Sequence, residues 1–254
     1  MRVIASVRRA GAGVAVDLAS AAFLVTTLPL PRPRRVSATA GRQFFPLIGL
    51  ALGGAASTVF WGGSRAISPT MGAFLAVTAL VLLTGGLHLD GLADCADGLF
   101  VGSTVERRLE IMRDSRVGSF GAIAIVLVLV GDVVALATLT PHDALVALVT
   151  TAGLARLGML ALVVTLPYAR PQGLGTLVEG GHKSRDFLVG AVTAAAPIVL
   201  DWRHGLLAAG LVVVTTIGVG ALALRRVGGV TGDIYGGVLE LSQLAALSAY
   251  AVRP

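Results

Sequence analysis

The sequence predicts an all-α, polytopic membrane protein in which a single domain, residues 1–254, forms a bundle of about seven spanning helices. Hydrophobic residues make up 55% of the chain and charged residues only 13%, whereas a soluble domain usually has about 25% charged residues. The apolar residues also lie in long runs, as a bilayer requires. The 33 glycines suit helices that pack closely in lipid. We therefore expect the lipid bilayer to surround most of this chain.

Seven apolar segments are long enough, or nearly so, to cross a hydrocarbon core of about 30 Å as helices. Connectors that are polar or contain Pro and Gly separate them. The segment at 187–201 is short for a complete span. We expect the spanning helices near residues 45–63, 69–89, 118–138, 144–167, 187–201, 205–223 and 234–251.

The charges of the connectors test this arrangement, because alternate connectors must share one side of the membrane. One set of connectors holds thirteen Lys and Arg residues, whereas the other set, with the C-terminus, holds three. Loops rich in Lys and Arg stay on the cytosolic side, which also accounts for the formal net charge of +6. No basic run with interleaved aromatics predicts a nucleic-acid partner. Ten of the fourteen carboxylates fall on or beside the same cytosolic face.

The apolar segment at residues 11–30 fits this scheme less well. If it spanned the membrane, Arg8 and Arg9 would lie outside the cytosol and Asp17 would lie in hydrocarbon, and both placements are unfavourable. We expect instead an interfacial or re-entrant helix with a cytosolic N-terminus.

Three aspartates, Asp90, Asp94 and Asp97, stand at positions i, i+4 and i+7. On a helix these positions share one face. Carboxylates so close together repel one another, and no Lys or Arg lies between residues 66 and 106 to compensate them. A divalent cation is the simplest compensation, and all-oxygen ligands favour Mg²⁺, Mn²⁺ or Ca²⁺ over zinc. The alternative is a solvated helix end that binds nothing.

A second polar segment follows these aspartates. We expect a short amphipathic helix on the membrane surface near residues 104–114, which returns Asp114 and Arg116 to the aspartates. Cations beside a metal-bound carboxylate cluster suit a diphosphate ligand. Gly91 and Gly98, which directly follow two of the aspartates, leave room for a bulky ligand or a close helix.

Four segments carry a more specific signal. They are HLDGLADCADGLF with ERRLEIMRDSRVGSFG at 88–121, QFFPLIG at 43–49, YARPQGLG at 168–175, and GGVTGDIYG at 228–236 with Glu240. Together they resemble the cobalamin synthase family, whose members are adenosylcobinamide-GDP ribazoletransferases of the bacterial inner membrane. Cys95 departs from the small Thr or Ser expected at its position, but it lies between the expected ligands.

The resemblance implies transfer of adenosylcobinamide phosphate from adenosylcobinamide-GDP to alpha-ribazole or its 5′-phosphate, with release of GMP. It implies Mg²⁺ as cofactor and a site on the cytosolic face of the cell inner membrane. Attack of an alcohol on a diphosphate needs cations, alignment and a proton acceptor. In this interpretation Asp90, Asp94, Asp97 and Asp114 bind metal, and Asp97 and Asp114 are catalytic. Whether Asp114 completes a two-metal site or acts as the base stays open, as does the formation of homo-oligomers.

Other polar residues are candidates for substrate binding. Arg156 lies in the middle of a span, where a charge is costly and usually functional; the alternative is an ion pair with Asp132. Arg170 could instead be a positive-inside anchor, and Thr231 and Asp233 could cap the last helix. The predicted substrate-binding residues are His88, Arg116, Arg156, Tyr168, Arg170, Thr231, Asp233 and Glu240.

Two other functions fit parts of the pattern. A CDP-alcohol phosphotransferase would use the same metal with other substrates, but Leu92, Ala93 and Asp94 follow Gly91 and do not give that family's DGxxAR spacing. A cation-coupled transporter would place carboxylates near mid-membrane on several helices. Here the carboxylates gather at one face, and Asp132 is the deep exception.

Overall fold

The computed structural model describes residues 2–28, 37, 39–101, 104–170, 178 and 180–252, with side chains from residue 13 onward. Parts of the predicted connectors, among them residues 31–36 and 171–177, lie outside the described residues. Within the described part the regular elements are helices, joined by one parallel bridge between Tyr168 and Val230. The predicted all-α class is confirmed. The elements are α1 Arg2–Val25, η1 Arg42–Phe44, α2 Phe45–Ala66, α3 Pro69–Thr84, α4 Leu87–Val101, α5 Val105–Ile111, α6 Ser119–Ala137, α7 Pro141–Thr165, α8 Lys183–Ala195, η3 Ala196–Leu200, α9 Trp202–Val227 and α10 Gly232–Ala251.

Four helical segments of the described chain are long and apolar enough to cross a membrane: Arg42–Ala66, α6, α7 and α9. A fifth span results if α3 and α4 are one broken span. The membrane character is thus confirmed, but the predicted number of seven spans is not. Segment 187–201 is divided between α8 and η3, and α10 has 20 residues but carries Asp233, Glu240 and Gln243 among its apolar ones.

The largest departure from the predicted spans lies between α3 and α4. The single helix expected at 69–89 ends at Thr84, and α4 begins at Leu87 at an angle of 89° to α3. Gly85 and Gly86 make the turn with φ values of 63° and 70°, a conformation that glycine adopts without strain. Hydropathy stays high across this turn, so the apolar pattern did not reveal it. The bend sets the direction of the helix that carries the three aspartates.

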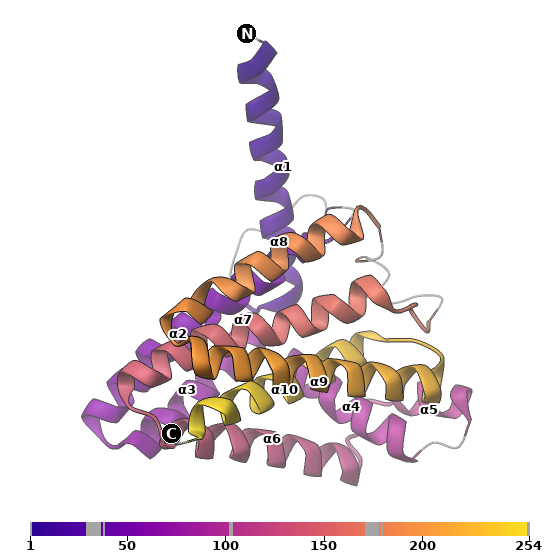
Figure 1. Cartoon of the computed structure of the whole chain (residues 1–254). Coiled ribbons are helices and arrows are strands. Elements are labelled where there is room, and N and C mark those ends of the chain that lie inside the picture. The colour runs from indigo at the N-terminus through magenta and orange to yellow at the C-terminus, as the bar shows by residue number, and fades with distance from the viewer. Residues whose placement is uncertain are drawn as a thin grey trace.

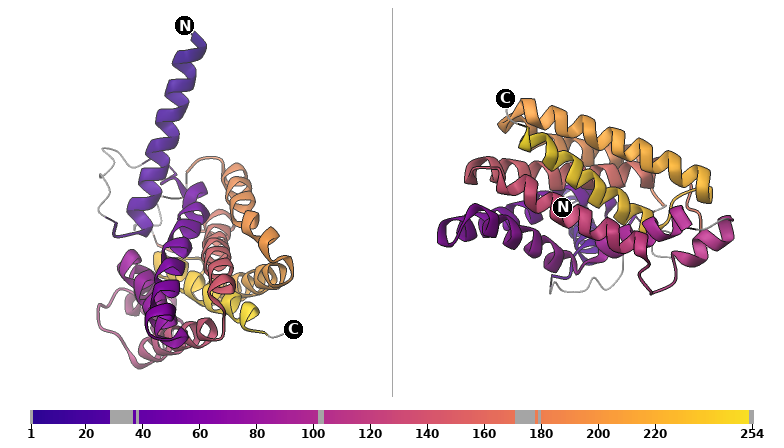
Figure 2. Two further views of the ribbon diagram at one scale, coloured as in Figure 1. Left: turned by 90° about the vertical axis from the view of Figure 1, so that its left-hand side faces the viewer. Right: turned by 90° about the horizontal axis from the view of Figure 1, so that it is seen from below.

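Helix α1 projects from the bundle, and its N-terminal part stands apart from the other elements in Figure 1 and in the left-hand view of Figure 2. Its C-terminal part is fastened to the bundle. Gln43 donates a hydrogen bond of 3.0 Å to Asp17, and the backbone N–H of Thr27 donates one of 2.9 Å to the carbonyl of Leu83. Among the residues whose side chains are described, the apolar part of this helix is Gly13–Val25, which is shorter than a span. Its interfacial or re-entrant placement stays a prediction.

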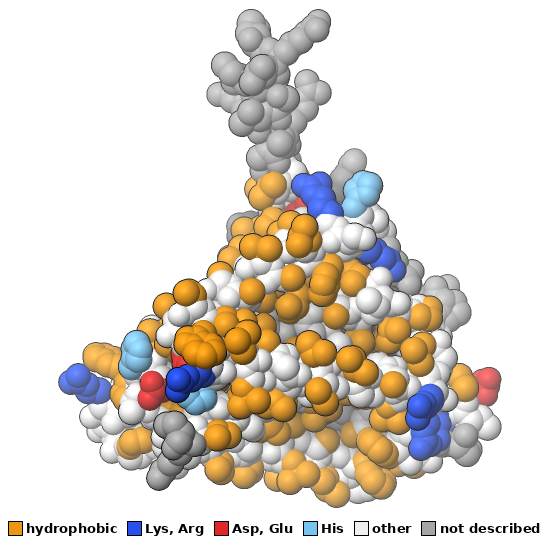
Figure 3. Space-filling model, viewed as in Figure 1, with side chains coloured by type: hydrophobic (Ala, Val, Ile, Leu, Met, Phe, Trp, Pro, Cys, Tyr) orange, Lys and Arg blue, Asp and Glu red, His pale blue; other side chains and the backbone are white. Residues whose placement is uncertain are grey.

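Helices α7 and α10 form the centre of the bundle. Helix α7 packs against α2, α8, α9 and α10, and α10 packs against α4, α6, α7 and α9. Most side chains of α7 and α10 are buried, whereas α6 and α9 leave most of their apolar side chains exposed. Figure 3 shows hydrophobic side chains over the face formed by α8 and α9, with charged side chains at its margins. This is the surface expected to contact lipid.

Glycines allow the central helices to approach closely. A Cβ atom at Gly49 or at Gly53 of α2 would collide with the backbone carbonyl of Ala152 or of Leu148 on α7. Small residues are the usual means by which membrane helices pack, because lipid gives no hydrophobic driving force between them. Gly49, the last residue of the QFFPLIG segment, therefore allows α2 to pack closely against α7.

Candidate active site

Helices α4 and α10 meet backbone to backbone at two glycines. A Cβ atom at Gly91 would lie 2.9 Å from the carbonyl oxygen of Asp233, and one at Gly236 would lie 2.8 Å from the carbonyl oxygen of His88. Real side chains do not come so close to backbone atoms, so the contact requires glycine at both positions. It brings Asp233 at the start of α10 beside Asp90 at the start of α4.

A cavity of about 260 Å³ lies at this contact. Its other walls come from α1, α2 and α7 and are mainly apolar. A largely apolar cavity with a few converging polar groups is the usual form of a small-molecule site. Five of the predicted site residues line it together: His88, Asp90, Tyr168, Arg170 and Asp233.

Two segments that are far apart in the sequence are joined beside this cavity. The parallel bridge between Tyr168 and Val230 connects the end of the α7 span to the residues before α10. Next to it, Nη2 of Arg170 lies 2.7 Å from Oδ2 of Asp233, and the two side chains are only 11% and 19% exposed. The rings of Tyr168 and Tyr235 stack with their centroids 6.4 Å apart. Arg170 is thus held by a carboxylate at the site.

Thr231 is the N-cap of α10, which was the alternative to a substrate-binding role. Its Oγ1 accepts a hydrogen bond of 3.3 Å from the backbone N–H of Ile234 and donates one of 3.1 Å to Oδ2 of Asp233. Such a cap satisfies an N–H group that has no partner within the helix. Arg170 and Thr231 both bond to Oδ2, so Oδ1 of Asp233 remains available to a ligand.

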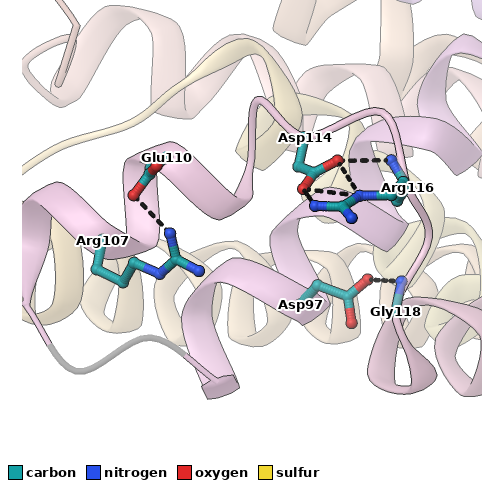
Figure 4. A network of polar contacts seen from close by, with 6 residues as sticks. All are labelled: Asp97, Arg107, Glu110, Asp114, Arg116 and Gly118. Atoms are coloured by element: carbon teal, nitrogen blue, oxygen red, sulfur yellow. Dashed lines mark hydrogen bonds and ion pairs between the residues drawn. The ribbon is translucent and has the colours of Figure 1, made fainter.

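Asp97 has a structural contact at the start of α6 (Figure 4). Its Oδ2 accepts a hydrogen bond of 2.7 Å from the backbone N–H of Gly118, and its Oδ1 accepts one of 3.0 Å from that of Gly121. A carboxylate is favoured at a helix N-terminus because it satisfies free N–H groups and complements the helix dipole. The metal-binding and catalytic roles of Asp97 stay predictions. In those roles its carboxylate would have to bind the ligand while it also caps α6.

Asp114 and Arg116 pair with each other on the connector before α6 (Figure 4). Nη2 of Arg116 lies 2.6 Å from Oδ2 of Asp114, and the backbone N–H of Arg116 donates a hydrogen bond of 3.1 Å to Oδ1. These hydrogen bonds lower the pKa of Asp114 to about 2, so its carboxylate is ionised at neutral pH. Neither side chain lines the cavity between α4 and α10.

The short surface helix predicted near residues 104–114 is present as α5. Its exposed Arg107 and Glu110 form an ion pair of 2.6 Å at i and i+3 (Figure 4), as expected for ordinary surface residues. Its Arg108 behaves differently, since it is buried and donates to the carbonyl oxygens of Gly98 and Leu99 at the end of α4.

The spacing of the aspartates on α4 limits how a divalent cation could bind. Asp90 and Asp97 share a face of α4, but seven residues of helix rise roughly 10 Å, too far for both to bind one ion. Across the described part of the chain, no group of three or more His, Cys, Asp or Glu side chains is arranged to hold a metal. Asp94 interacts electrostatically with three carboxylates and one arginine: Asp233, Asp90, Asp97 and Arg170. Oxygen donors with excess negative charge suit a hard cation whose remaining ligands are water and substrate oxygens.

Two predicted substrate-binding residues, Arg156 and Glu240, line a second cavity of about 20 Å³, which is enclosed by α3, α4, α6, α7 and α10. Arg156 is 1% exposed, and its Nη1 donates a hydrogen bond of 3.0 Å to the carbonyl of Ala152. The alternative ion pair with Asp132 is not formed between these two described side chains, since Oδ1 of Asp132 and Nε of Arg156 lack hydrogen-bond partners. His88 lines both cavities.

The sequence prediction missed a buried ion pair between Arg42 and Asp186. Nη2 and Nε of Arg42 lie 2.7 and 3.0 Å from Oδ2 of Asp186, and Nη1 donates to the carbonyl of Val178. Arg42 is completely buried, although in the sequence it counts only as one of many cytosolic cations. The one available signal was its position directly before the QFFPLIG segment. The pair fastens the start of α2 to α8 and to the connector that follows Arg170.

Comparison with known proteins gives the family of this chain. A family model described as cobalamin-5-phosphate synthase matches residues 17–251. The adenosylcobinamide-GDP ribazoletransferases of Escherichia coli K12 and of Escherichia coli O157:H7 are each 36% identical over 231 residues, which cover 87% of this chain and 94% of theirs. No solved structure matches. The match favours a transferase over the two alternatives, a CDP-alcohol phosphotransferase and a transporter. The chain therefore belongs to the cobalamin-5-phosphate synthase family and is a transferase of cobalamin biosynthesis.

Proposed function

We propose that this transferase moves adenosylcobinamide phosphate from adenosylcobinamide-GDP to alpha-ribazole or alpha-ribazole 5′-phosphate and releases GMP. The observation that carries the proposal is the cavity between α4 and α10, where aspartates and Arg170 converge in a chain that matches its family over residues 17–251. The Escherichia coli relatives are named for the same two reactants, adenosylcobinamide-GDP and ribazole. The product would be adenosylcobalamin or its 5′-phosphate.

The reaction exchanges one phosphorus–oxygen bond for another. The hydroxyl oxygen of the ribazole bonds to the phosphorus that carries cobinamide, and the bond from this phosphorus to the oxygen of the leaving GMP breaks. The hydroxyl proton passes to a base. Negative charge on the diphosphate must be neutralised while the reactants are held in line. Positive groups beside the diphosphate are therefore the main catalytic requirement.

Arg170 is the protein cation best placed to bind the diphosphate. It lines the cavity, and Asp233 orients its guanidinium through Nη2. Its Nε is buried without a hydrogen-bond partner, so this donor is available to a phosphate oxygen. Guanidinium groups bind phosphates through pairs of N–H donors with well-defined direction.

Asp90 and Asp94 are the residues that we propose to hold Mg²⁺. Proteins commonly bind Mg²⁺ through one or two carboxylates, with substrate phosphates and water as the other ligands. When bound, Mg²⁺ would supply charge neutralisation at the diphosphate. Asp114 is a weak base because of its low pKa, and an efficient general base has a pKa near the working pH. Of its two open roles, general base or ligand in a two-metal site, we therefore propose the second.

We also propose that the site faces the cytosol across the cell inner membrane. The support is the excess of Lys and Arg in the connectors that share a side with the site residues, thirteen against three. Accessibility of single cysteines in sealed vesicles of known orientation tests this placement. A cysteine at Glu106 on α5 should react from the cytosolic side, and reaction only from the other side would contradict it.

The activity is tested with purified protein in liposomes, adenosylcobinamide-GDP, alpha-ribazole and Mg²⁺. We expect release of GMP that requires both organic substrates, stops with EDTA and returns when Mg²⁺ is added in excess. A parallel reaction with alpha-ribazole 5′-phosphate identifies the preferred acceptor. No release of GMP with either acceptor would overturn the proposed reaction, and release that resists EDTA would overturn the metal.

A further inference from the structure

The second cavity is a separate polar site inside the bundle. We call it the inner polar site and define it by the six polar side chains that line it. They come from five helices that meet there, and the most exposed of them, Glu240, is only 9% exposed. These side chains are Thr84 of α3, His88 of α4, Asp132 of α6, Arg156 of α7, and Glu240 and Gln243 of α10.

Three atoms of the inner polar site lack a direct partner. They are Nε2 of His88, Oδ1 of Asp132 and Nε of Arg156, all buried. Buried polar atoms are nearly always hydrogen-bonded to protein or to an ordered water. The cavity has a volume of about 20 Å³, whereas one water needs on the order of 10–15 Å³ and two to four polar partners. The site therefore has both the volume and the partners for one water molecule.

The charges of the inner polar site do not balance if each side chain takes its usual state. Among the described residues that line it, Arg156 is the cation, and Asp132 and Glu240 are two potential anions. Among the described lining residues, the remaining titratable side chain is His88 on α4, and the one polar side chain from α3 is Thr84. An uncompensated charge inside a membrane protein is costly. One carboxyl must therefore be neutral, or a second cation must be present.

The surroundings of the two carboxyls are different. Glu240 interacts electrostatically with Arg156, and these two groups are the natural ion pair. Asp132 interacts with Glu240 and with the side-chain amide of Gln243. A protonated Asp132 would remove the repulsion from Glu240 and provide an O–H donor. The excess charge is thus relieved most simply at Asp132.

We propose that the inner polar site binds one water molecule and one proton, with the proton on Asp132 and with Arg156 and Glu240 as an ion pair bridged by the water. The five helices α3, α4, α6, α7 and α10 are joined through this site. His88 extends from it to the cavity that contains Asp90, so the site positions α4 against α10. This inference does not depend on the identity of the substrates.

Infrared spectroscopy of protein labelled with ¹³C at the aspartate carboxyls tests the proton. At neutral pH we expect a carbonyl band of a protonated aspartic acid that shifts with the label. Asp132→Asn should remove it. Glu240→Gln should also remove it, because Asp132 then ionises to balance Arg156. The exposed Glu106→Gln variant is the control and should keep the band. Absence of the band in the unsubstituted protein would overturn the proposal.

Thermal unfolding in detergent provides a second test that does not use activity. Asp132→Asn should lower the midpoint by less than about 3 °C, because the amide replaces a neutral acid. The double variant Asp132→Asn/Glu240→Gln leaves Arg156 without an anion and should lower the midpoint by roughly 10 °C, more than the sum of the single variants. If the double variant is too unstable to purify, the single variants and the infrared band still decide. A midpoint that rises with Na⁺ or K⁺ at constant ionic strength would show that a bound cation balances the charge of the site. Additive effects of the two substitutions would show that another arrangement balances it. Either result would overturn the proposal.

Discussion

Arg170 and Asp233 are 63 residues apart in the chain, yet Nη2 of Arg170 lies 2.7 Å from Oδ2 of Asp233 at the edge of the cavity. The parallel bridge between Tyr168 and Val230 holds the two segments in register beside this ion pair. The pair therefore links the connector after α7 to the start of α10, and it sets the direction of Arg170, which lines the cavity. Its contribution to substrate binding can be measured.

Arg170→Lys keeps the positive charge but loses the planar set of N–H donors. We expect the KM for adenosylcobinamide-GDP to rise about 10- to 100-fold, the effect of losing one hydrogen bond to a charged group. Steady-state kinetics of GMP release measures it. The exposed Arg185→Lys is the matched control and should leave KM unchanged. An unchanged KM in Arg170→Lys would remove Arg170 from the diphosphate site.

Asp94→Asn removes a charge from the proposed metal-binding pair without changing the size of the side chain. We expect the turnover number to fall by about 10²- to 10³-fold, similar to the loss of other transition-state charge stabilisation, with normal membrane insertion. Glu106→Gln, an exposed acid on the nearby α5, should be fully active. Full activity of Asp94→Asn would contradict its role in the site.

Asp114 can be tested through the pH dependence of activity. Its pKa is lowered to about 2, so any stability from its pairing with Arg116 is present above its ordinary pKa and lost only as the pH falls towards 2. We therefore expect Asp114→Asn to lower the activity. If the activity declines on the acid side, between about pH 5 and 7, the midpoint of that decline should be the same in the variant, because Asp114 does not titrate in this range. If that decline disappeared in the variant, Asp114 would be the general base after all.

Gly91→Ala tests the contact between α4 and α10. The added Cβ would lie 2.9 Å from the carbonyl oxygen of Asp233, so the helices must separate, at a cost of about 1–3 kcal/mol in the free energy of unfolding. We expect activity to fall at least about tenfold with it. Gly210→Ala is the control on α9, because nothing lies within 4 Å of the added atom. It should be neutral or stabilising by about 0.5–1 kcal/mol.

Arg42→Met leaves the carboxylate of Asp186 buried without its partner. Breaking a buried ion pair on one side costs about 3–5 kcal/mol, and we expect a loss of this size in the free energy of unfolding in detergent. The double variant Arg42→Met/Asp186→Leu should recover part of the loss because no unpaired charge remains. Arg185→Met, an exposed neighbour on α8, should have little effect. Equal losses in the single and double variants would show that packing, and not charge, dominates.

The predictions made from the sequence succeeded where they depended on spacing within one element. Asp90, Asp94 and Asp97 do lie on one helix, α4, and the short surface helix follows as α5. The spacing did not show that Asp90 lines a cavity while Asp97 caps α6. The predicted number of seven spans is not confirmed, and hydropathy alone did not reveal the turn at Gly85 and Gly86 within the helix expected at 69–89.

By itself the sequence determined the membrane class, the helical content and the family, because composition and local motifs depend on the chain alone. Only the tertiary structure decided which partners the polar residues have. It paired Arg170 with Asp233 and Arg42 with Asp186, and it separated Asp132 from a direct bond with Arg156. These contacts join segments that are distant in the sequence, so they depend on how the helices pack. The packing depends in turn on how closely the helices approach one another at glycines such as Gly91.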